Sequence, residues 1–394
     1  MNPIGHPSAG DQTNEETGSE SWSRIYRHWA STPGTPSARI STSSWCATRR
    51  TPWSTGLRDA GYTYLVIDDC WAEKERDDSH RLVPSHEKFP SGMKALADYV
   101  HGKGLKFGMY SCAGNQTCAG YPSSFEYEFI DAATFASWGV DFLKYDFCNR
   151  PAHVPGHILY KRMGAALANC GRDILFSACS WGAEDTKSWI KTTGAGMWRS
   201  TGDIFDNWES IKSLFNQQVD IQAYNGTGCF NDMDMLVVGM GGAGNVGMGG
   251  CTFEEYRTHF TLWAMLNSPL MIGCDIRNIR QESLDILTNA DVLAVNQDPA
   301  CRQPYIISGG ADTPVIVKLL EGGDFAIGMF NMTDEVRGPQ FTLADMGLGR
   351  VCGKTLEMRE LWSGKTAAPQ DYLYREVIQP HDCRIFRARV VDAR

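Results

Sequence analysis

No stretch of the 394-residue sequence is apolar over the roughly 18 residues that a membrane-spanning helix needs. The sequence also lacks a block of Lys and Arg, and its formal net charge is −9. No basic segment followed by an apolar one begins the chain, so we find no indication of a signal peptide, and the sequence is compatible with an extracellular or a cytoplasmic location. We therefore expect neither a membrane nor a nucleic acid as a partner.

Motifs typical of zinc and nucleotide sites are missing as well. The 13 cysteines form no Cys-x2-Cys pair, and no two histidines have the spacing of a zinc protease. Their odd number leaves at least one unpaired, and both disulfides and buried thiols remain open. Residues 239–244 satisfy Gly-x-Gly-x-x-Gly, but the chain up to Gly250 has no helical apolar period, as a dinucleotide site requires. The sequence therefore predicts neither a zinc site nor a dinucleotide site.

The chain divides into four segments that differ in composition and in the spacing of their apolar residues. Residues 1–24 are polar and rich in Gly, Ser and Glu, which predicts a disordered tail. Residues 25–53 have no apolar period and fit neither a helix nor a strand. In residues 54–299 and 300–394 the apolar residues are regularly spaced. The 12 Trp, 14 Tyr and 17 Phe of the chain can form a substantial core.

Short apolar runs alternate with helical patterns through residues 54–299. This alternation predicts an α/β fold with a parallel sheet. Seven expected strands carry polar residues at their carboxyl ends, which favours a (β/α)8 TIM barrel with one strand unaccounted for, and an open doubly wound sheet is the alternative. The expected strands are 62–68, 105–110, 140–146, 174–178, 197–200, 233–238 and 270–274, and the expected helices are 92–103, 132–138, 157–169, 188–192, 207–219, 256–266 and 284–295.

After about residue 300 the helical period disappears. Short strands separated by Gly, Pro and Asp predict a C-terminal antiparallel β-sandwich domain over residues 300–394 that packs against the barrel. The expected strands are 315–320, 325–330, 341–343, 360–362, 372–378 and 383–390.

Polar side chains follow several of the barrel strands at the point where each strand ends. They are Asp68, Asp69, Lys144, Asp146, Cys179, Ser180, Trp181, Arg199, Asp203, Asp232 and Asp234. In a barrel these ends meet on one face, where the active site lies. Carboxylates, cations and indole rings on one rim suit a sugar, whose hydroxyls bind charged groups and whose C–H face stacks on Trp. The alternative is that these acids only cap helices and loops.

Two of these carboxylates could carry glycoside hydrolysis. Asp146 follows Lys144, whose charge would keep it ionised and nucleophilic. Asp203 stands four residues after Arg199 in a polar loop, and as a general acid it would need a raised pKa. Met235 is a further candidate for the wall of the site.

Seven motifs in this order closely resemble the α-galactosidase/α-N-acetylgalactosaminidase family, glycoside hydrolase family 27. The resemblance covers about residues 54–394. The motifs are Tyr-Leu-Val-Ile-Asp-Asp-Cys-Trp (64–71), Lys-Phe-Pro-Ser-Gly-Met-Lys-Ala-Leu (88–96), Thr-Cys-Ala-Gly-Tyr-Pro-Ser-Ser (117–124), Trp-Gly-Val-Asp-Phe-Leu-Lys-Tyr-Asp (138–146), Trp-Arg-Ser-Thr-Gly-Asp-Ile (198–204), Asn-Asp-Met-Asp-Met-Leu (231–236) and Asn-Gln-Asp-Pro (296–299).

The resemblance implies a retaining exo-glycosidase that releases terminal α-linked galactose from oligosaccharides or glycoconjugates without a metal or cofactor. By position, Asp146 matches the nucleophile and Asp203 the acid/base. The expected substrate-binding residues are Asp68, Asp69, Trp71, Lys144, Cys179, Ser180, Trp181, Ala183, Arg199, Asp232 and Met235, and Cys118 and Cys148 match a family disulfide.

The identity of the sugar depends on two small residues. Many α-galactosidases carry Glu and a bulky residue where this chain has Ser180 and Ala183. The small pair resembles α-N-acetylgalactosaminidases, in which the freed volume admits an acetamido group. We place α-galactose first and keep α-N-acetylgalactosamine as the alternative. A catalytically dead galactoside-binding protein, a metal-dependent barrel enzyme using Asp68, Asp69 and Asp232, and a homodimer also remain open.

The family's first-strand motif is absent, although residues 25–53 have its length. Shifted by one base, permitted codons for residues 29–35 encode Gly-Phe-Asn-Ser-Trp-Asn, which resembles that motif. We infer that residues 25–53 are a frame-shifted translation of strand 1 and helix 1, so that the first strand is corrupted. A barrel without this strand would expose two sheet edges.

Overall fold

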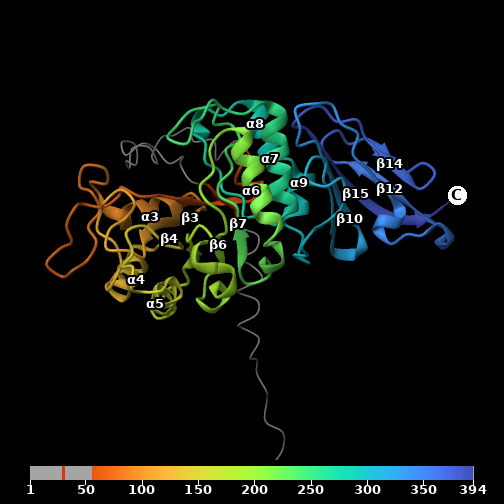
Figure 1. Cartoon of the computed structure of the whole chain (residues 1–394). Helices are drawn as coiled ribbons and strands as arrows, with labels where there is room; N and C mark the ends of the chain where they lie inside the picture. Colours follow the sequence, from red (N-terminus) through yellow and green to blue (C-terminus); the bar gives the residue numbers. More distant parts are fainter. Residues whose placement is uncertain (1–28, 32–55, 394) are drawn as a thin grey trace, which may run out of the picture.

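The computed structural model describes residues 29–31 and 56–393 of the chain (Figure 1). A barrel of parallel strands, coloured orange to green, lies beside a C-terminal β domain, coloured blue. None of the helices in these residues is long and apolar enough to cross a membrane. The division into an α/β part and a β part is the one that the sequence predicts.

The first part is built on one seven-stranded sheet whose neighbours are consecutive and parallel. After the last strand, a parallel bridge between Leu236 and Ile272 carries the curled sheet onward, so the architecture is the expected TIM barrel. The strands are β1 (Trp29–Ser31), β2 (Tyr62–Val66), β3 (Lys106–Cys112), β4 (Phe142–Asp146), β5 (Leu175–Ala178), β6 (Met197–Arg199) and β7 (Phe230–Asp232).

Two expected strands are wrong in position. The run 233–238 is not a strand, because β7 ends at Asp232 and Asp234 has a φ of 82°, which breaks the extended backbone. The buried residues that follow fill the core, and of them Leu236 alone makes the bridge to Ile272. The expected strand 270–274 is therefore reduced to this bridge.

The segment expected to lack a strand contains a short one. β1 pairs in parallel with β2, and Trp29 lies opposite Tyr62. The structure thus differs from the prediction at residues 29–31. The expected tail at 1–24 and the rest of the segment 25–53 lie outside the described residues.

Seven α-helices of the described chain surround the barrel sheet. α7 begins with a capping box in which Thr252 and Glu255 satisfy each other's backbone N–H groups. The helix expected at 284–295 is two helices, because the Asn289 side chain accepts from the N–H groups of Asp291 and Val292 and starts a new one. The helices are α3 (Gly92–Gly102), α4 (Glu128–Trp138), α5 (Gly156–Ala168), α6 (Trp208–Val219), α7 (Phe253–Met265), α8 (Gln281–Leu287) and α9 (Ala290–Asn296), and the expected segment 188–192 is the 3-10 turn η3 (Ile190–Thr192).

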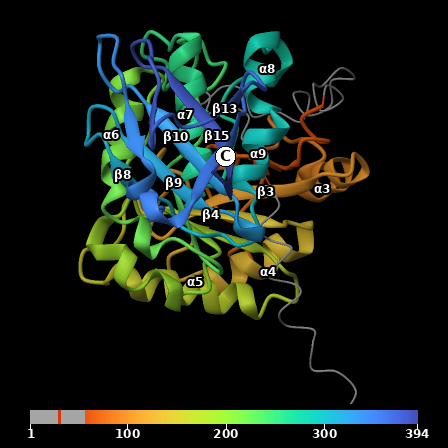
Figure 2. The same ribbon diagram turned by 90° about the vertical axis from the view of Figure 1, so that its right-hand side faces the viewer.

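The β domain consists of a six-stranded antiparallel sheet and a two-stranded one. The six strands run in the order β13-β12-β15-β10-β9-β8, and β11 pairs with β14. Figure 2 shows this domain, in blue, facing the viewer. The strands are β8 (Tyr305–Ser308), β9 (Val315–Leu319), β10 (Phe325–Phe330), β11 (Gln340–Thr342), β12 (Lys354–Glu360), β13 (Thr366–Ala367), β14 (Leu373–Arg375) and β15 (Cys383–Asp392).

One expected strand of this domain is wrong. Residues 360–362 form the end of β12 and a turn, because the Glu360 carboxylate accepts from the N–H groups of Trp362 and Ser363 at 3.2 and 2.6 Å. The sequence also gives no sign of β8 and β13.

The two domains meet along α7, which is buried over most of its length and contacts β10 and β15. His381 of the β domain stacks on Trp208 of α6 with ring centroids 4.5 Å apart. The His381 ring also lies 2.7 Å from a carboxylate oxygen of Glu255. Arg257 of α7 pairs with Asp382 at 2.5 Å. These apolar and polar contacts fix the β domain against the barrel, as predicted.

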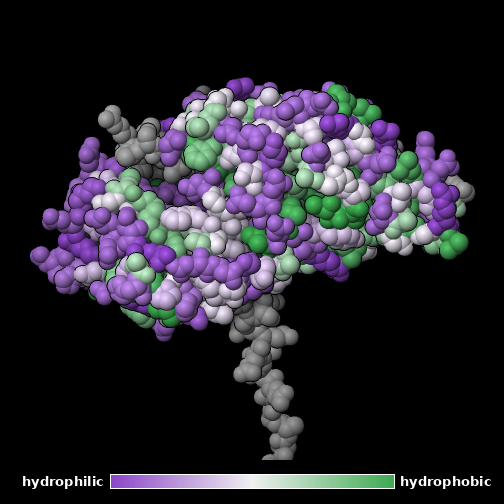
Figure 3. All heavy atoms as spheres, in the orientation of Figure 1, coloured by the Kyte–Doolittle hydropathy of each residue, from purple (hydrophilic) through white to green (hydrophobic). Residues whose placement is uncertain are grey.

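Hydrophilic side chains dominate the molecular face in Figure 3, and hydrophobic ones form small scattered groups. The apolar residues are instead gathered in three buried clusters. One lies in the barrel, one lies in the β domain, and the third extends from the barrel into the β domain.

Candidate active site

The carboxyl ends of four barrel strands bring charged side chains together, as the sequence predicts. Lys144 of β4 reaches Asp68, two residues beyond β2, with 2.8 Å between Nζ and Oδ2. Arg199 ends β6, and Asp232 ends β7 directly beside it in register. Parallel strands place these ends at the same rim of the barrel.

Asp146 is buried at the end of β4, and both of its oxygens are fixed. Oδ1 accepts from the N–H of Phe147 at 2.9 Å, and Oδ2 accepts from the hydroxyl of Tyr110 at 3.1 Å. Burial raises the pKa of Asp146, and the charge of Lys144 offsets part of this rise. The prediction that Lys144 favours the ionised form is correct for the effect of Lys144 itself, but burial outweighs it.

Lys144 keeps its charge in spite of its burial. Burial disfavours the ammonium group, but the negative charges of Asp68 and Asp146 hold the pKa of Lys144 above its ordinary value. The Nζ atom also lies 5.3 Å from the centre of the Tyr110 ring. The site therefore holds a fixed cation between Asp68 and Asp146.

Asp69 and Trp71 point in different directions. Asp69 accepts from the N–H of Ala119 at 2.9 Å, while Cys70 between the two has a φ of 68° and turns the chain sharply. Trp71 is buried in the core, and its Nε1 donates to the carbonyl of Tyr110 at 2.8 Å. Its ring packs on Phe135 and Trp138. Trp71 thus supports β3 from the core, whereas Asp69 stays near Asp68.

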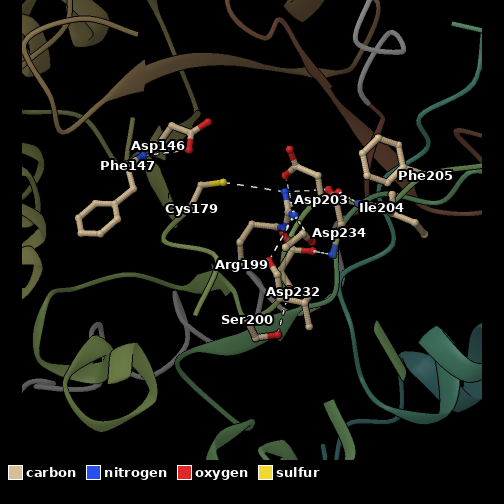
Figure 4. Close-up of polar contacts among 12 residues, drawn as sticks. Asp146, Phe147, Cys179, Arg199, Ser200, Asp203, Ile204, Phe205, Asp232 and Asp234 are labelled. Atoms are coloured by element: carbon tan, nitrogen blue, oxygen red, sulfur yellow. Dashed lines mark hydrogen bonds and ion pairs between the residues drawn. The ribbon is translucent and has the colours of Figure 1, made fainter. Parts of the chain in front are cut away.

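Arg199 binds two carboxylates and is itself buried (Figure 4). Nη2 lies 2.9 Å from Oδ1 of Asp203, and Nη1 lies 2.9 Å from Oδ1 of Asp234. The Asp203 side chain is 64% exposed, so the acid at this position faces solvent while Asp146 does not. The protein around Asp203 removes part of its hydration, which would raise its pKa. The charges of Arg199 and Lys144 outweigh this and hold the pKa below its ordinary value.

Asp232 and Asp234 form the floor below Arg199. The backbone N–H of Asp234 donates to Oδ1 of Asp232 at 2.9 Å, and burial raises the pKa of Asp232 to about 6 against the pull of Arg199. Oδ2 of Asp234 accepts from the N–H of Ile204 at 2.8 Å, next to Asp203. Asp234 therefore positions both Arg199 and the loop that carries Asp203.

The loop after β5 carries four of the predicted residues. Cys179 is buried with Sγ 3.9 Å from Nη1 of Arg199, and Figure 4 shows it between Asp146 and the guanidinium. Burial raises the pKa of its thiol well above the ordinary value. Ser180 is also buried, and its hydroxyl donates to Thr186 at 2.8 Å. Trp181 makes an edge contact with Phe147, and Ala183 starts the turn η2 (Ala183–Ser188).

Met235 is packed in the core. It lies against Gly273, where an added Cβ would come within 2.5 Å of the Met235 sulfur. Met235 is therefore held by the barrel interior, next to the floor of the site.

The predicted disulfide between Cys118 and Cys148 is present. The Cys118 sulfur lies 3.6 Å from Oδ2 of Asp146, so the bridge supports the loop beside this carboxylate. Cys118, Asp146 and Cys148 lie close enough together to resemble a metal site, but both cysteines are used in the bridge and offer no thiolate.

Two functional residues were missed by the sequence analysis. Tyr110 was expected only as a strand residue, and Asp234 was noted at a strand end without a role. The position of Asp234 just beyond a strand was the available signal, since active-site residues of a barrel lie at the carboxyl ends of its strands. Tyr110 lies within β3, where an aromatic residue is ordinary core, and nothing in its pattern points to Asp146.

Two family models match most of the chain. Residues 20–298 match the family model described as alpha galactosidase A, and residues 310–388 match that of the alpha galactosidase C-terminal beta sandwich domain. The alpha-galactosidase of Cyamopsis tetragonoloba is 43% identical over 334 residues, which are 84% of this chain and 78% of that protein.

Two solved structures show the same fold. The alpha-galactosidase I of Mortierella vinacea superposes with a TM-score of 0.83 at 31% identity and covers 93% of this chain and 97% of its own. The alpha-galactosidase of Saccharomyces cerevisiae with raffinose has a TM-score of 0.81 at 26% identity and covers 93% of this chain and 98% of its own. The chain belongs to the α-galactosidase family, glycoside hydrolase family 27, and is a hydrolase of terminal α-linked galactose.

Proposed function

We propose that the chain releases galactose by a double displacement with retention of configuration, in which Asp146 is the nucleophile and Asp203 the acid/base. The observation that carries the assignment is the contrast between the two carboxylates. Asp146 is buried and both of its oxygens are hydrogen-bonded, whereas Asp203 is exposed on a loop. A nucleophile must be aimed at one carbon, and an acid/base must reach a leaving group and then water.

The first step forms a bond between an oxygen of Asp146 and the anomeric carbon while the bond to the leaving oxygen breaks. The proton on Asp203 passes to that oxygen. In the second step the ionised Asp203 takes a proton from water, and the water oxygen displaces Asp146 from the sugar. Hydrogen bonds from Phe147 and Tyr110 hold Asp146 in a fixed position and leave little motion to be lost on reaction.

The charged residues around this pair supply the sugar contacts. Asp68 and Lys144 form an ion pair on one side, with Asp69 next to Asp68 in the chain. Arg199 lies on the other side. Charged hydrogen bonds to hydroxyl groups are stronger and more directional than neutral ones. An α-galactoside such as raffinose, the ligand of the yeast structure, is the substrate class that we propose.

α-Galactose takes precedence over α-N-acetylgalactosamine in this proposal. The Ser180 hydroxyl donates a hydrogen bond to Thr186 of the same loop, so its proton is used within the protein. Ala183 at the start of η2 favours the alternative sugar, because its side chain is small. The ratio of kcat/KM for nitrophenyl α-galactoside and nitrophenyl α-N-acetylgalactosaminide decides between the two sugars, and a strong preference for the second would contradict our choice.

A homodimer stays a proposal, to be tested by the mass of the protein in solution.

Proton NMR of the sugar in the first minutes of turnover tests the mechanism. Retention predicts α-galactose as the first product, whereas initial β-galactose means inversion. Asp146→Asn should lower kcat by at least about 10³-fold, while Asp78→Asn, at an exposed carboxylate, should leave it unchanged. Unchanged activity of Asp146→Asn would refute its role, and no turnover by the parent chain would favour a galactoside-binding protein. Loss of turnover in a chelator would favour a metal-dependent enzyme.

A further inference from the structure

A second polar cavity lies between α7 of the barrel and the β domain. Its volume is about 540 Å³. Pockets of about 300–1,000 Å³ are the usual size of small-ligand sites. The lining comes from α7, the turn between β12 and β13, and the strands β14 and β15, and none of the candidate active-site residues takes part.

The charges around this cavity nearly cancel. Arg257, Lys365 and Arg384 contribute three cations, and Glu360 and Glu376 contribute two carboxylates. Beneath them Asp382 lies 2.5 Å from Nη2 of Arg257 and 3.0 Å from Nη1 of Arg384. Because this third carboxylate balances the third cation, the cavity suits a neutral ligand better than an anion. Donors and acceptors lie side by side, which is what hydroxyl groups require, since each hydroxyl donates one hydrogen bond and accepts others.

An indole ring forms one wall. Trp362 is half-buried, its Nε1 donates to the Thr261 hydroxyl at 3.3 Å, and its ring meets Phe260 with centroids 6.3 Å apart. These contacts fix the ring while part of it stays exposed. An aromatic wall combined with charged hydrogen-bonding groups suits a pyranose, which has an apolar C–H face and a polar rim.

The polar groups of the cavity are held in place by the strands that carry them. Both oxygens of Glu360 accept from the backbone of the following turn, and the Tyr374 hydroxyl donates to Glu376. Such a preformed arrangement loses little conformational entropy when it takes up a ligand. Ser363, Lys365 and Thr366 are exposed and stand at the entrance.

We propose that this cavity is a second saccharide-binding site, which holds a neutral galactose-bearing glycan apart from the active site. The proposal goes beyond the catalytic function. Two sites on one chain raise the effective concentration of a polymeric substrate, and a substrate with one short sugar chain gains nothing from them. The cavity should therefore matter for polysaccharides and not for small galactosides.

Affinity electrophoresis of the full chain through gels containing galactomannan tests the site. The Asp146→Asn chain serves as the parent, so that the gel polysaccharide is not consumed. Thr366→Trp fills the entrance with an indole at an exposed position, and Trp362→Ala removes the aromatic wall. Phe129→Ala, at an exposed aromatic of α4, is the matched control. We expect both cavity variants to weaken retention at least about tenfold, and the control to migrate like the parent.

Kinetics with Asp146 intact separate this site from the catalytic one. Thr366→Trp should lower kcat/KM on galactomannan and leave kcat/KM on nitrophenyl α-galactoside unchanged. Equal retention of Thr366→Trp and the parent would overturn the proposal, and so would loss of parent retention in millimolar inorganic phosphate, which would mark an anion site. Failure of the catalytic proposal would show instead as an inactive parent enzyme on the small substrate.

Discussion

Arg199 holds Asp203 with 2.9 Å between Nη2 and Oδ1, and its charge favours the ionised carboxylate. The same guanidinium binds Asp234 at the same distance through its other nitrogen. An acid/base must carry a proton before it can give one away. In the mechanism that we propose, a sugar that binds near Arg199 draws this cation away from Asp203 before the first step.

Asp234→Asn should move the basic limb of the pH dependence of kcat/KM to lower pH. Asp203 raises the pKa of Asp234, and by reciprocity the Asp234 charge raises the pKa of Asp203. Without that charge, Arg199 stabilises ionised Asp203 more strongly, so the protonated acid is lost at a lower pH. Steady-state measurement of kcat/KM across the pH range locates the basic limb. The control Asp78→Asn should leave the limb at the same pH. A shift to higher pH would show that Asp234 does not act on Asp203.

Asp232→Asn should stabilise the fold, and the gain should grow with pH. The pKa of Asp232 is about 6 in the folded chain against an ordinary 3.8. Between these values the folded state binds a proton that the unfolded state has lost, so native stability falls as pH rises. Asn does not titrate, so the Asp232→Asn variant does not lose stability in this way as pH rises. The gain in unfolding free energy should rise through this window to on the order of 3 kcal/mol and stay constant above it, as measured by denaturant titration. A gain independent of pH would contradict the buried, protonated Asp232.

Removal of the disulfide should lower both stability and turnover. The bridge spans 30 residues, and the loop-closure estimate for that length is about 3–4 kcal/mol. Because the Cys118 sulfur lies 3.6 Å from Asp146, the double variant Cys118→Ala/Cys148→Ala should also reduce kcat. Denaturant unfolding without reductant gives the first effect. Cys352→Ala, at an exposed free thiol, should change neither, and an unaltered double variant would show that the bridge has no role.

The coding DNA decides the origin of residues 25–53. We expect the shifted frame to encode a continuous Gly-Phe-Asn-Ser-Trp-Asn segment, and a chain corrected to that frame to be more active on nitrophenyl α-galactoside than the chain as written. A stop codon in the shifted frame, or equal activity of the two chains, would reject the frame-shift hypothesis.

The sequence was sufficient for the site residues that sit at strand ends. Lys144, Asp146 and Arg199 follow regular apolar runs, and parallel strands bring such ends together wherever the barrel forms. The sequence could not show in which direction a side chain points beyond the end of its strand. The positive φ of Cys70 separates Asp69 from Trp71, and that of Asp234 ends the strand before the run 233–238. These turns are imposed by tertiary contacts and leave no period in the sequence.

The strands of the β domain were harder to place for a similar reason. Residues 360–362 look like a strand because Leu361 and Trp362 are apolar. The Glu360 carboxylate, however, accepts from the N–H groups of Trp362 and Ser363 and turns the chain. Pairing with β15 then moves the strand to Lys354–Glu360, whose alternation of buried and exposed residues is visible only once the partner is known.

Trapping the glycosyl-enzyme with a slowly hydrolysed fluorinated α-galactoside tests the account most directly. Mass spectrometry of the digested chain should find one added sugar on the peptide that contains Asp146, and none in Asp146→Asn. A sugar on a different carboxylate, or turnover of the parent with no covalent sugar at any time, would contradict the assignment of Asp146 as the nucleophile.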